Sequence, residues 1–377
     1  MKILIDGRMI KGTGIGRYID QLVRELVDQD KNNKYLLLVL EKDKDSIDIE
    51  ADNLELVVCD ISWYSLGEQS ELLRVITTFR PDLVHFANFN FPVRYKGRFV
   101  MTIHDLTLWR YRNTKSGLKR FIDPLRSQVM RWMVKRGAKR AEKIFCPSEF
   151  VKSDLVETLG IDPDKIVVTK LAGFGKKVAK TDIRVDLRQY GINRPYLLYV
   201  GNLYLNKNIE RLIVVLARLV IEAKLDIQLV LVGKKTIYHQ RLEQIVLEAE
   251  LHERVIFTDY LDDQTLLGVY KQALCYTFPS LSEGFGLPIL EAMNQDLPVV
   301  CSSTTSVGEI GGYAVESFNP TDIDDMYQKI LSVLESPDRR EELILLGRKR
   351  VKQFSWQDTA SKTLEVYRQV LEVASSD

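Results

Sequence analysis

The stretch Cys275-Tyr-Thr-Phe-Pro-Ser-Leu-Ser-Glu-Gly-Phe-Gly-Leu-Pro-Ile-Leu-Glu-Ala-Met293 joins a short apolar run, a glycine-containing loop and a segment of helical period. The run over 275–278 predicts a buried strand. Pro288 suits the first turn of the helix that follows, where a backbone N–H has no partner to lose. A strand that leads through a short loop into a helix is the repeating unit of a parallel sheet. This stretch therefore predicts an α/β fold.

The same alternation of short β-rich runs and helical segments extends along the chain in two series. Strands are expected over 3–6, 34–40, 54–58, 83–86, 99–103, 143–146 and 166–169, and again over 196–200, 227–232, 255–258, 275–278 and 298–301. A polar stretch after Gly173 separates the two series. We therefore predict two Rossmann-like, doubly wound domains over 1–173 and 190–354 that face a central cleft. The apolar face of a last helix, within 355–377, predicts that it packs back on the N-terminal domain.

Composition excludes several other classes of protein. The chain has 377 residues, and its formal net charge of +1 gives no overall reason to expect nucleic-acid binding. The four cysteines form no CxxC motif or Cys/His cluster, so we expect buried free thiols and no metal site. No apolar run of about 18 residues occurs, and the N-terminus enters a strand directly. These features predict a cytoplasmic protein.

Two loops carry the residue types that a phosphorylated sugar ligand needs. Gly284 and Gly286 let the backbone approach a ligand, and the following helix N-terminus offers N–H groups to a diphosphate. Glu283 and Glu291 supply carboxylates that accept hydrogen bonds from hydroxyl groups. In the second loop, Lys207 follows a strand that ends in Gly201, which places an ammonium above a phosphate site.

The spacing of Glu283 and Glu291 within EGFGLPILE resembles the EX7E motif of family-4 retaining glycosyltransferases of GT-B fold. The GIGRY loop (14–18) and the DLVHF (82–86) and TIHDL (102–106) contexts look most like bacterial mannosyltransferases. The resemblance implies that Glu283 lies beside the donor sugar and that Glu291 binds the nucleotide ribose. It implies that Lys207 neutralises the departing diphosphate. Asn202 stands where the family often has an arginine, so one positive charge is missing there. The other residues implied to contact the donor in this motif are Gly284, Phe285, Gly286 and Leu287.

Further loops gain a role from the same resemblance. In the N-terminal acceptor domain, Gly14 and Gly16 of the loop after the first strand would face the donor phosphates and the acceptor. His104, in Thr102-Ile-His-Asp-Leu106, is similar to a family histidine that contacts the donor sugar. His85 is equally compatible with a packing role. Lys234 and Leu261 lie in loops of the C-terminal donor domain that would flank the nucleotide base.

The resemblance implies transfer of a hexose with retention of anomeric configuration, without a metal or other cofactor. GDP-mannose is the expected donor, and a glycan or lipid-linked molecule is the expected acceptor. Two alternatives stay open. One is a transferase that uses UDP-glucose or another nucleotide sugar, and the other is a nucleotide-sugar-binding protein of epimerase type that is not a transferase. Residues 110–140 are rich in lysine and arginine, with Asp123 as the single acid. This stretch is either a solvated helix or a surface that docks peripherally on an anionic cell membrane.

Overall fold

The computed structural model describes residues 1–110, 119–173 and 185–372. The chain divides into two compact units. The first comprises Met1–Leu171 together with Ser355–Asp377, and the second comprises Ala172–Phe354. The last helix of the chain therefore belongs to the first unit.

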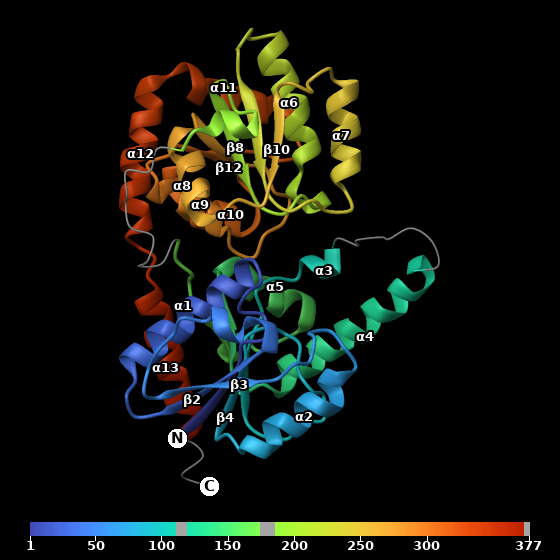
Figure 1. Ribbon diagram of the computed structural model, residues 1–377, viewed down its shortest axis with the longest axis vertical. Coiled ribbons are helices and arrows are strands. Elements are labelled where there is room, and N and C mark those ends of the chain that lie inside the picture. The colour runs from blue at the N-terminus through green and yellow to red at the C-terminus, as the bar shows by residue number, and fades with distance from the viewer. Residues whose placement is uncertain (111–118, 174–184, 373–377) are drawn as a thin grey trace. The chain divides into compact units, whose positions relative to one another are not determined.

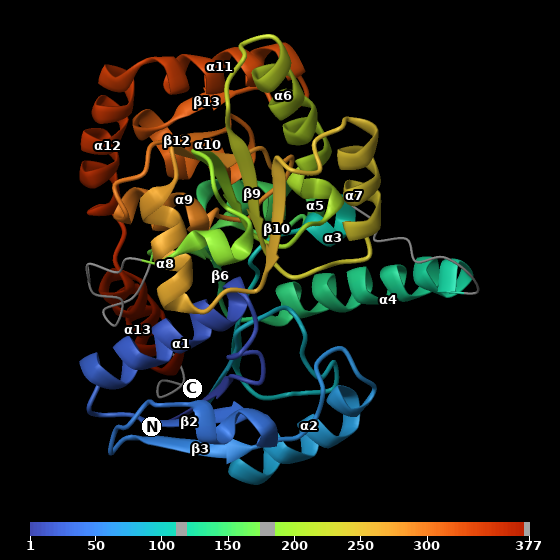
Figure 2. The same ribbon diagram turned by 45° about the horizontal axis from the view of Figure 1, so that its top comes forward.

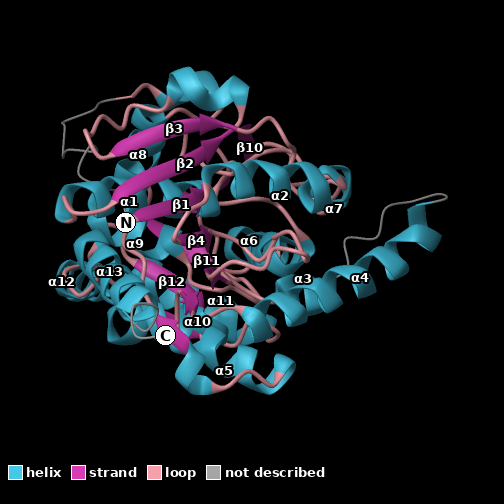
Figure 3. Cartoon of the chain, turned by 90° about the horizontal axis from the view of Figure 1, so that it is seen from below, coloured by secondary structure: helices cyan, strands magenta, loops and turns pink. Residues whose placement is uncertain are grey.

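The first unit is built on a parallel sheet of seven strands in the order β3-β2-β1-β4-β5-β6-β7. The strands are β1 (Lys2–Asp6), β2 (Lys34–Val39), β3 (Leu54–Val58), β4 (Leu83–Phe86), β5 (Phe99–Thr102), β6 (Ile144–Cys146) and β7 (Ile166–Val168). Figure 3 shows β3, β2, β1 and β4 side by side. The strand order reverses between β1 and β4, which is where open α/β sheets bind ligands at the carboxyl ends of their strands.

Helices cover both faces of this sheet. They are α1 (Gly14–Gln29), α2 (Gly67–Phe79), α3 (Thr107–Arg110), α4 (Lys119–Arg140), α5 (Glu149–Leu159) and α13 (Trp356–Glu372). Buried residues of α2, α4 and α5, such as Leu72, Val134 and Leu155, form one apolar core with the strands. On α13, the predicted apolar face is buried and packs against α1, beside which it lies in Figure 1. The predicted return of the last helix to the N-terminal unit is confirmed.

The second unit contains a parallel sheet of six strands in the order β10-β9-β8-β11-β12-β13. Its strands are β8 (Tyr196–Val200), β9 (Gln228–Val232), β10 (Val255–Asp259), β11 (Cys275–Phe278), β12 (Val299–Ser302) and β13 (Glu316–Phe318). Figure 2 shows β9 and β10 side by side. Between β8 and β11 the strand order reverses again, so the loops after these two strands are neighbours.

The helices of the second unit lie on both faces of its sheet. They are α6 (Ile209–Ile221), α7 (His239–Glu248), α8 (Asp263–Gln272), α9 (Leu287–Asn294), α10 (Thr305–Gly311), α11 (Ile323–Glu335) and α12 (Pro337–Val351). Helix α11 packs against α6, and α12 packs against α9. The predicted doubly wound α/β fold with two Rossmann-like sheets is confirmed, and the four cysteines are buried free thiols as expected. The predicted linker after Gly173 lies outside the described residues.

Candidate functional site

The loop between β11 and α9 brings the glycine-rich motif to the carboxyl end of the second sheet. Gly286 adopts a φ of 105°, which favours glycine, and Leu287 begins α9 with Pro288 in its first turn. Gly284 is buried and Leu287 is half-buried, so both lie close to the body of the unit. Helix α9 begins beyond the carboxyl end of β11, the end of the sheet where ligands bind. In its first turn Pro288 has no N–H, and Ile289 N–H donates to the Gly286 carbonyl (3.0 Å).

Lys207 and Glu283 form an ion pair at the neighbouring ends of β8 and β11. Lys207 Nζ lies 2.5 Å from Glu283 Oε1, and the two side chains are 17% and 13% exposed. The ammonium has three N–H donors, and this contact uses one of them. Two donors are therefore left to bind phosphate oxygens without breaking the pair. The structure brings these two predicted catalytic residues together.

Two asparagines that the sequence analysis did not single out hold this pair in place. The buried Asn206 donates from Nδ2 to the backbone carbonyl of Ser282 (3.1 Å). The backbone carbonyl of Asn206 accepts from Leu281 N–H (2.7 Å). Asn208, at a φ of 61°, donates to the carbonyls of Pro279 (3.0 Å) and Pro320 (2.7 Å). Asn206 and Asn208 directly flank Lys207. They tie the lysine loop to the loop that carries Glu283.

Glu291 and Phe285 lie deeper in the unit than Glu283. Glu291 is 3% exposed, and its Oε2 accepts a hydrogen bond of 3.1 Å from Tyr270 OH. Phe285 is 5% exposed and packs edge-on against Phe354, with ring centroids 5.9 Å apart. The backbone of Phe285, rather than its ring, is thus the part that can meet a ligand.

The loops after β8, β9 and β10 pack closely at the same end of the sheet. A Cβ atom at Gly233 would lie 2.0 Å from the carbonyl oxygen of Gly201, so the end of β9 requires its glycine. Asn202 is half-buried, and its carbonyl accepts from Tyr199 OH at 3.2 Å. Lys234 is exposed, with Nζ 5.6 Å from the centre of the exposed Tyr260 ring, whereas Leu261 is buried. These loops expose an aromatic ring with a cation over it.

In the first unit, the two predicted glycines play different parts. A Cβ at Gly14 would meet no atom within 4 Å, so this position is open to a ligand. At Gly16, by contrast, a Cβ would lie 2.6 Å from the carbonyl oxygen of Ile10. Gly16 is therefore needed by the turn that starts α1, whether or not a ligand binds.

His104 follows β5 and is half-buried. Its Nε2 lies 3.0 Å from the carbonyl oxygen of Ala87, which can only accept, so Nε2 carries the proton. Burial lowers the pKa of His104, which keeps the ring neutral near pH 7. Nδ1 is then an acceptor suited to a sugar hydroxyl. His85, by contrast, is fully buried between Thr102 and Tyr367, which favours the packing role for it.

A buried ionic network, which the sequence analysis missed, lies behind the loop that follows β1. Arg8 is 1% exposed and binds both Asp6 and Glu68 at 2.7 Å. Asn90 Nδ2 donates to the same oxygen of Glu68 (2.5 Å). Burial raises the pKa of Glu68, against the opposing effect of Arg8. Arg8 also donates to the Ile61 carbonyl (2.9 Å), and Glu68 accepts from Tyr64 N–H (2.9 Å), so the network is satisfied inside the unit.

Neither a metal cluster nor a membrane-spanning helix is found in the part of the chain that the structure describes. Within it, no group of three or more His, Cys, Asp or Glu side chains is arranged to hold a metal ion. Among the same residues, no helix combines the length and apolar character needed to cross a bilayer. Of the basic stretch 110–140, residues 111–118 lie outside the described residues.

Two Rossmann-like units, one with a Lys–Glu pair beside a helix N-terminus, have the architecture of a GT-B glycosyltransferase. Residues 12–170 match the family model described as Glycosyltransferase Family 4, and residues 182–350 match the model described as Glycosyl transferases group 1. The chain therefore belongs to family 4 of the glycosyltransferases. As a member of this family it is an enzyme that uses a nucleotide-sugar donor and a glycan acceptor.

Relatives and solved structures agree with this assignment. O-antigen chain mannosyltransferase B of Escherichia coli is 28% identical, over 98% of this chain and 100% of that protein. O-antigen chain mannosyltransferase RfbU of Salmonella typhimurium is 26% identical, over 63% of this chain and 61% of its own length. The structure of sucrose-phosphate synthase from Thermosynechococcus elongatus superposes with a TM-score of 0.78 at 19% identity, and covers 99% of both chains. This last likeness concerns the fold alone.

Proposed function

We propose that this enzyme transfers mannose from GDP-mannose, with retention of anomeric configuration, to a glycan or lipid-linked acceptor. The two mannosyltransferase relatives support the choice of sugar, and the one from Escherichia coli matches over its whole length. The observation that carries the proposal is the ion pair between Lys207 and Glu283. It puts a cation and a carboxylate within reach of a single sugar diphosphate.

The chemistry follows from the charges. As the bond between the anomeric carbon and the diphosphate oxygen breaks, negative charge grows on the diphosphate. Lys207 and the positive end of the α9 helix dipole stabilise that charge. Glu283, held by Lys207 on one oxygen, keeps its second oxygen for a hydroxyl group of the donor sugar. The acceptor hydroxyl oxygen then bonds to the anomeric carbon from the face that the diphosphate leaves, and its proton passes to the departing diphosphate oxygen.

Each of the remaining predicted residues is assigned to one part of the donor. We assign the ribose to Glu291, whose partner Tyr270 fixes the orientation of its carboxylate. The base is assigned to the loops of Lys234 and Leu261, and His104 Nδ1 to a hydroxyl of the transferred sugar. In this scheme the cationic side chain and backbone N–H groups do the work that a divalent metal does in other transferases. Asn202 adds a dipole rather than a charge to the diphosphate site.

A panel of donors tests the proposal. The protein is mixed with GDP-mannose, UDP-glucose, UDP-galactose or ADP-glucose and a mannoside acceptor, and the product is followed by proton NMR. Transfer from GDP-mannose with an α-anomeric product is expected. Transfer from a uridine donor alone would overturn the assignment of base and sugar. A β-anomeric product would overturn retention.

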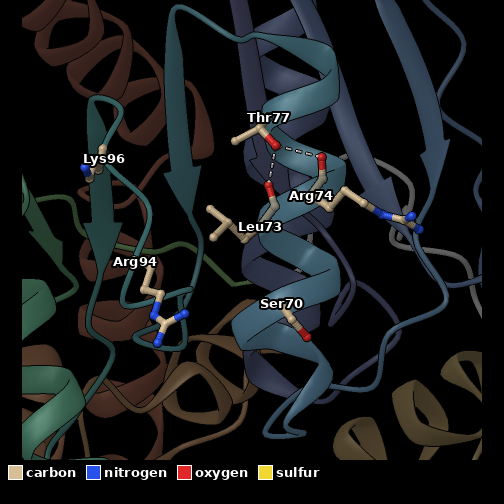
Figure 4. A pocket seen from close by; sticks show the side chains of 6 residues that line it. All are labelled: Ser70, Leu73, Arg74, Thr77, Arg94 and Lys96. Carbon is tan, nitrogen blue, oxygen red and sulfur yellow. Dashed lines mark hydrogen bonds between the residues drawn. The ribbon is translucent and has the colours of Figure 1, made fainter.

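We also propose that the enzyme docks on an anionic membrane surface through the first unit. A hollow of about 430 Å³ lies between α2 and the segment before β5, and its lining is shown in Figure 4. It is lined by Ser70, Leu73, Arg74, Thr77, Arg94 and Lys96. A second hollow of about 660 Å³ shares Arg94 and Lys96 and is also lined by Val93, Trp132, Arg136 and Arg140. We call these two hollows together the α2–α4 groove.

Charge and exposure support this role for the α2–α4 groove. Its lining contains five cationic side chains and no acidic one. Trp132 is 56% exposed, and Arg136 lies 5.6 Å from the centre of its ring. Cations bind lipid phosphates, and an exposed tryptophan suits the boundary between headgroups and acyl chains.

Vesicle sedimentation tests the docking surface. Wild-type protein should bind vesicles that contain phosphatidylglycerol, and binding should weaken as salt rises. Arg94→Gln, Lys96→Gln and Arg136→Gln combined should release it. The matched control changes Lys224, Lys349 and Lys352, which are exposed on the second unit, to glutamine. Equal release by both triple variants would mean that net charge alone drives binding and would contradict the assigned surface.

A further inference from the structure

We infer that Tyr18 is a positioning residue for His104, and that the C-terminal helix α13 controls it through a buried chain of hydrogen bonds. The chain runs from Tyr367 through His85 and Thr102 to Tyr18. The inference rests on the proposed role of His104 at the donor sugar. It gives the returning helix a part in catalysis besides packing.

The contacts of the chain are short and continuous. Tyr367 OH lies 2.5 Å from His85 Nδ1, and His85 Nε2 lies 2.7 Å from Thr102 Oγ1. Thr102 Oγ1 in turn lies 2.9 Å from Tyr18 OH. The four residues come from α13, β4, β5 and α1. The chain thus crosses from the last helix of the sequence to the first.

Burial makes each link depend on the others. His85 is 0% exposed, Tyr18 0%, Tyr367 1% and Thr102 2%, so water does not replace a lost partner. Burial lowers the pKa of His85 to about 3, so its ring is neutral and has one donor and one acceptor nitrogen. Each hydroxyl can donate one hydrogen bond and accept another. Removing one hydroxyl therefore costs a buried neighbour one of its two hydrogen bonds and loosens the ring that it held.

The end of the chain meets His104. The Tyr18 ring stands edge-on to the His104 ring, with centroids 4.8 Å apart and an angle of 78° between the planes. On its other side, His104 Nε2 is held by the Ala87 carbonyl. Together, the tyrosine ring and this hydrogen bond fix the plane of the imidazole. That plane decides where Nδ1 points, and hence whether it meets a sugar hydroxyl.

Three tyrosine-to-phenylalanine variants of the full chain test the inference. Tyr367→Phe cuts the chain at its far end, and Tyr18→Phe keeps the ring beside His104 but removes the hydroxyl. Tyr35→Phe is the matched control, because Tyr35 is also buried in the first unit and donates to Asp30 (2.6 Å) rather than to the chain. Each variant is examined for its melting temperature, its kcat and KM for the donor, and the NMR signal of the His104 ring, which His104→Gln assigns.

All three variants should melt at lower temperature. Tyr367→Phe and Tyr18→Phe should also lower kcat about tenfold and shift the His104 signal, as expected for a hydrogen bond lost behind a positioned group. The double variant should be no slower than the slower single one, because both changes break one chain. Tyr35→Phe should leave kcat and the His104 signal unchanged.

Two results would overturn the inference. One is a Tyr367→Phe protein that melts lower but keeps wild-type kcat and His104 signal, since α13 would then only stabilise the fold. The other is a Tyr35→Phe protein that shifts the signal as much as Tyr367→Phe does. If Tyr367→Phe does not fold, Tyr18→Phe still tests whether the chain positions His104, and wild-type kcat and His104 signal in that variant would overturn the inference. The NMR signal needs no donor, so a wrong donor assignment would not imitate either result.

Discussion

Charged residues at the carboxyl ends of the two sheets differ in exposure. In the second unit, Lys207 and Glu283 pair at the end of the sheet and stay partly exposed, at 17% and 13%. In the first unit, Arg8, Asp6 and Glu68 are buried, and both carboxylates bind the one guanidinium. What the first unit offers at its sheet end is the open backbone of Gly14 and the neutral ring of His104.

This difference indicates which part of a nucleotide sugar each unit suits. A diphosphate needs a cation with unused N–H donors, and the second unit has one in Lys207. Sugar hydroxyls bind neutral acceptors as well as carboxylates, and the first unit offers a neutral acceptor in His104. One type of fold thus suits two kinds of ligand chemistry. The second unit keeps an ion pair partly exposed, whereas the first unit buries its ionic network.

The largest expected effect comes from removing the cation of the second unit. Lys207→Met keeps much of the side-chain volume and should lower kcat for mannosyl transfer about 100- to 1000-fold, since the departing diphosphate loses its charge partner. Lys329→Met is the matched control, because Lys329 pairs with Glu316 at 2.8 Å in the same unit. A similar loss of activity in both variants would mean that a broken ion pair, not the diphosphate, explains the effect.

Glu283→Gln should come next, with transfer about 100-fold slower. The amide is isosteric but loses the charge that holds Lys207 and orients the sugar. Affinity for GDP should stay within a few-fold of wild type, as measured by calorimetry. Glu316→Gln serves as the control for a lost carboxylate. Near-normal transfer by Glu283→Gln would contradict its place in the site.

Asn206→Ala should have a moderate effect. It removes the hydrogen bond to the Ser282 carbonyl, so the loops of Lys207 and Glu283 lose one of their ties. We expect transfer to be about tenfold slower and the free energy of unfolding to fall by about 1 kcal/mol. Asn206→Asp, which can accept but not donate at this carbonyl, should not restore activity. Wild-type rates in both variants would show that the tie is dispensable.

Stability of the first unit should depend on pH through His85. The folded protein holds this histidine with a pKa of about 3, whereas the unfolded chain binds the proton near pH 6.5. The free energy of unfolding therefore falls progressively as pH drops below about 6.5, and His85 alone lowers it by about 2 kcal/mol between pH 7 and 5. Urea unfolding at the two pH values should show a shallower dependence in His85→Gln. An equal pH dependence of stability in wild type and His85→Gln would contradict a neutral, buried His85.

The smallest expected effect is that of a chelator. Since Lys207 and backbone N–H groups are proposed to carry the diphosphate charge, excess EDTA should leave the initial rate within about twofold of its value without chelator. Added Mg²⁺ or Mn²⁺ should not raise it. A rate that vanishes with EDTA and returns with metal would assign the diphosphate to a cation from solution.

The fold and the centre of the site were predictable because they depend on local pattern. Strand runs and glycine loops placed Lys207 and Glu283 after strands that proved to be neighbours. Asn206 and Asn208 were missed, since their partners Ser282 and Pro320 are distant in sequence and only the folded chain brings them close.

The sequence also could not show which loop side chains face inward. Phe285 belongs to the motif, yet its ring packs against Phe354. Arg8 and Glu68 are 60 residues apart, and charged residues at such positions are usually exposed. For His85, the sequence left two alternatives, and the hydrogen bonds to Thr102 and Tyr367 favour one of them.

The central claim, that Lys207 of the second unit holds the donor diphosphate, is tested most directly by calorimetric titration of GDP and of guanosine into wild-type protein and Lys207→Met. GDP should bind the wild type much more tightly than guanosine does. In Lys207→Met the advantage of GDP over guanosine should shrink about tenfold or more, as expected for a lost charge-assisted hydrogen bond, while guanosine affinity stays the same. An unchanged advantage of GDP in Lys207→Met would contradict the account.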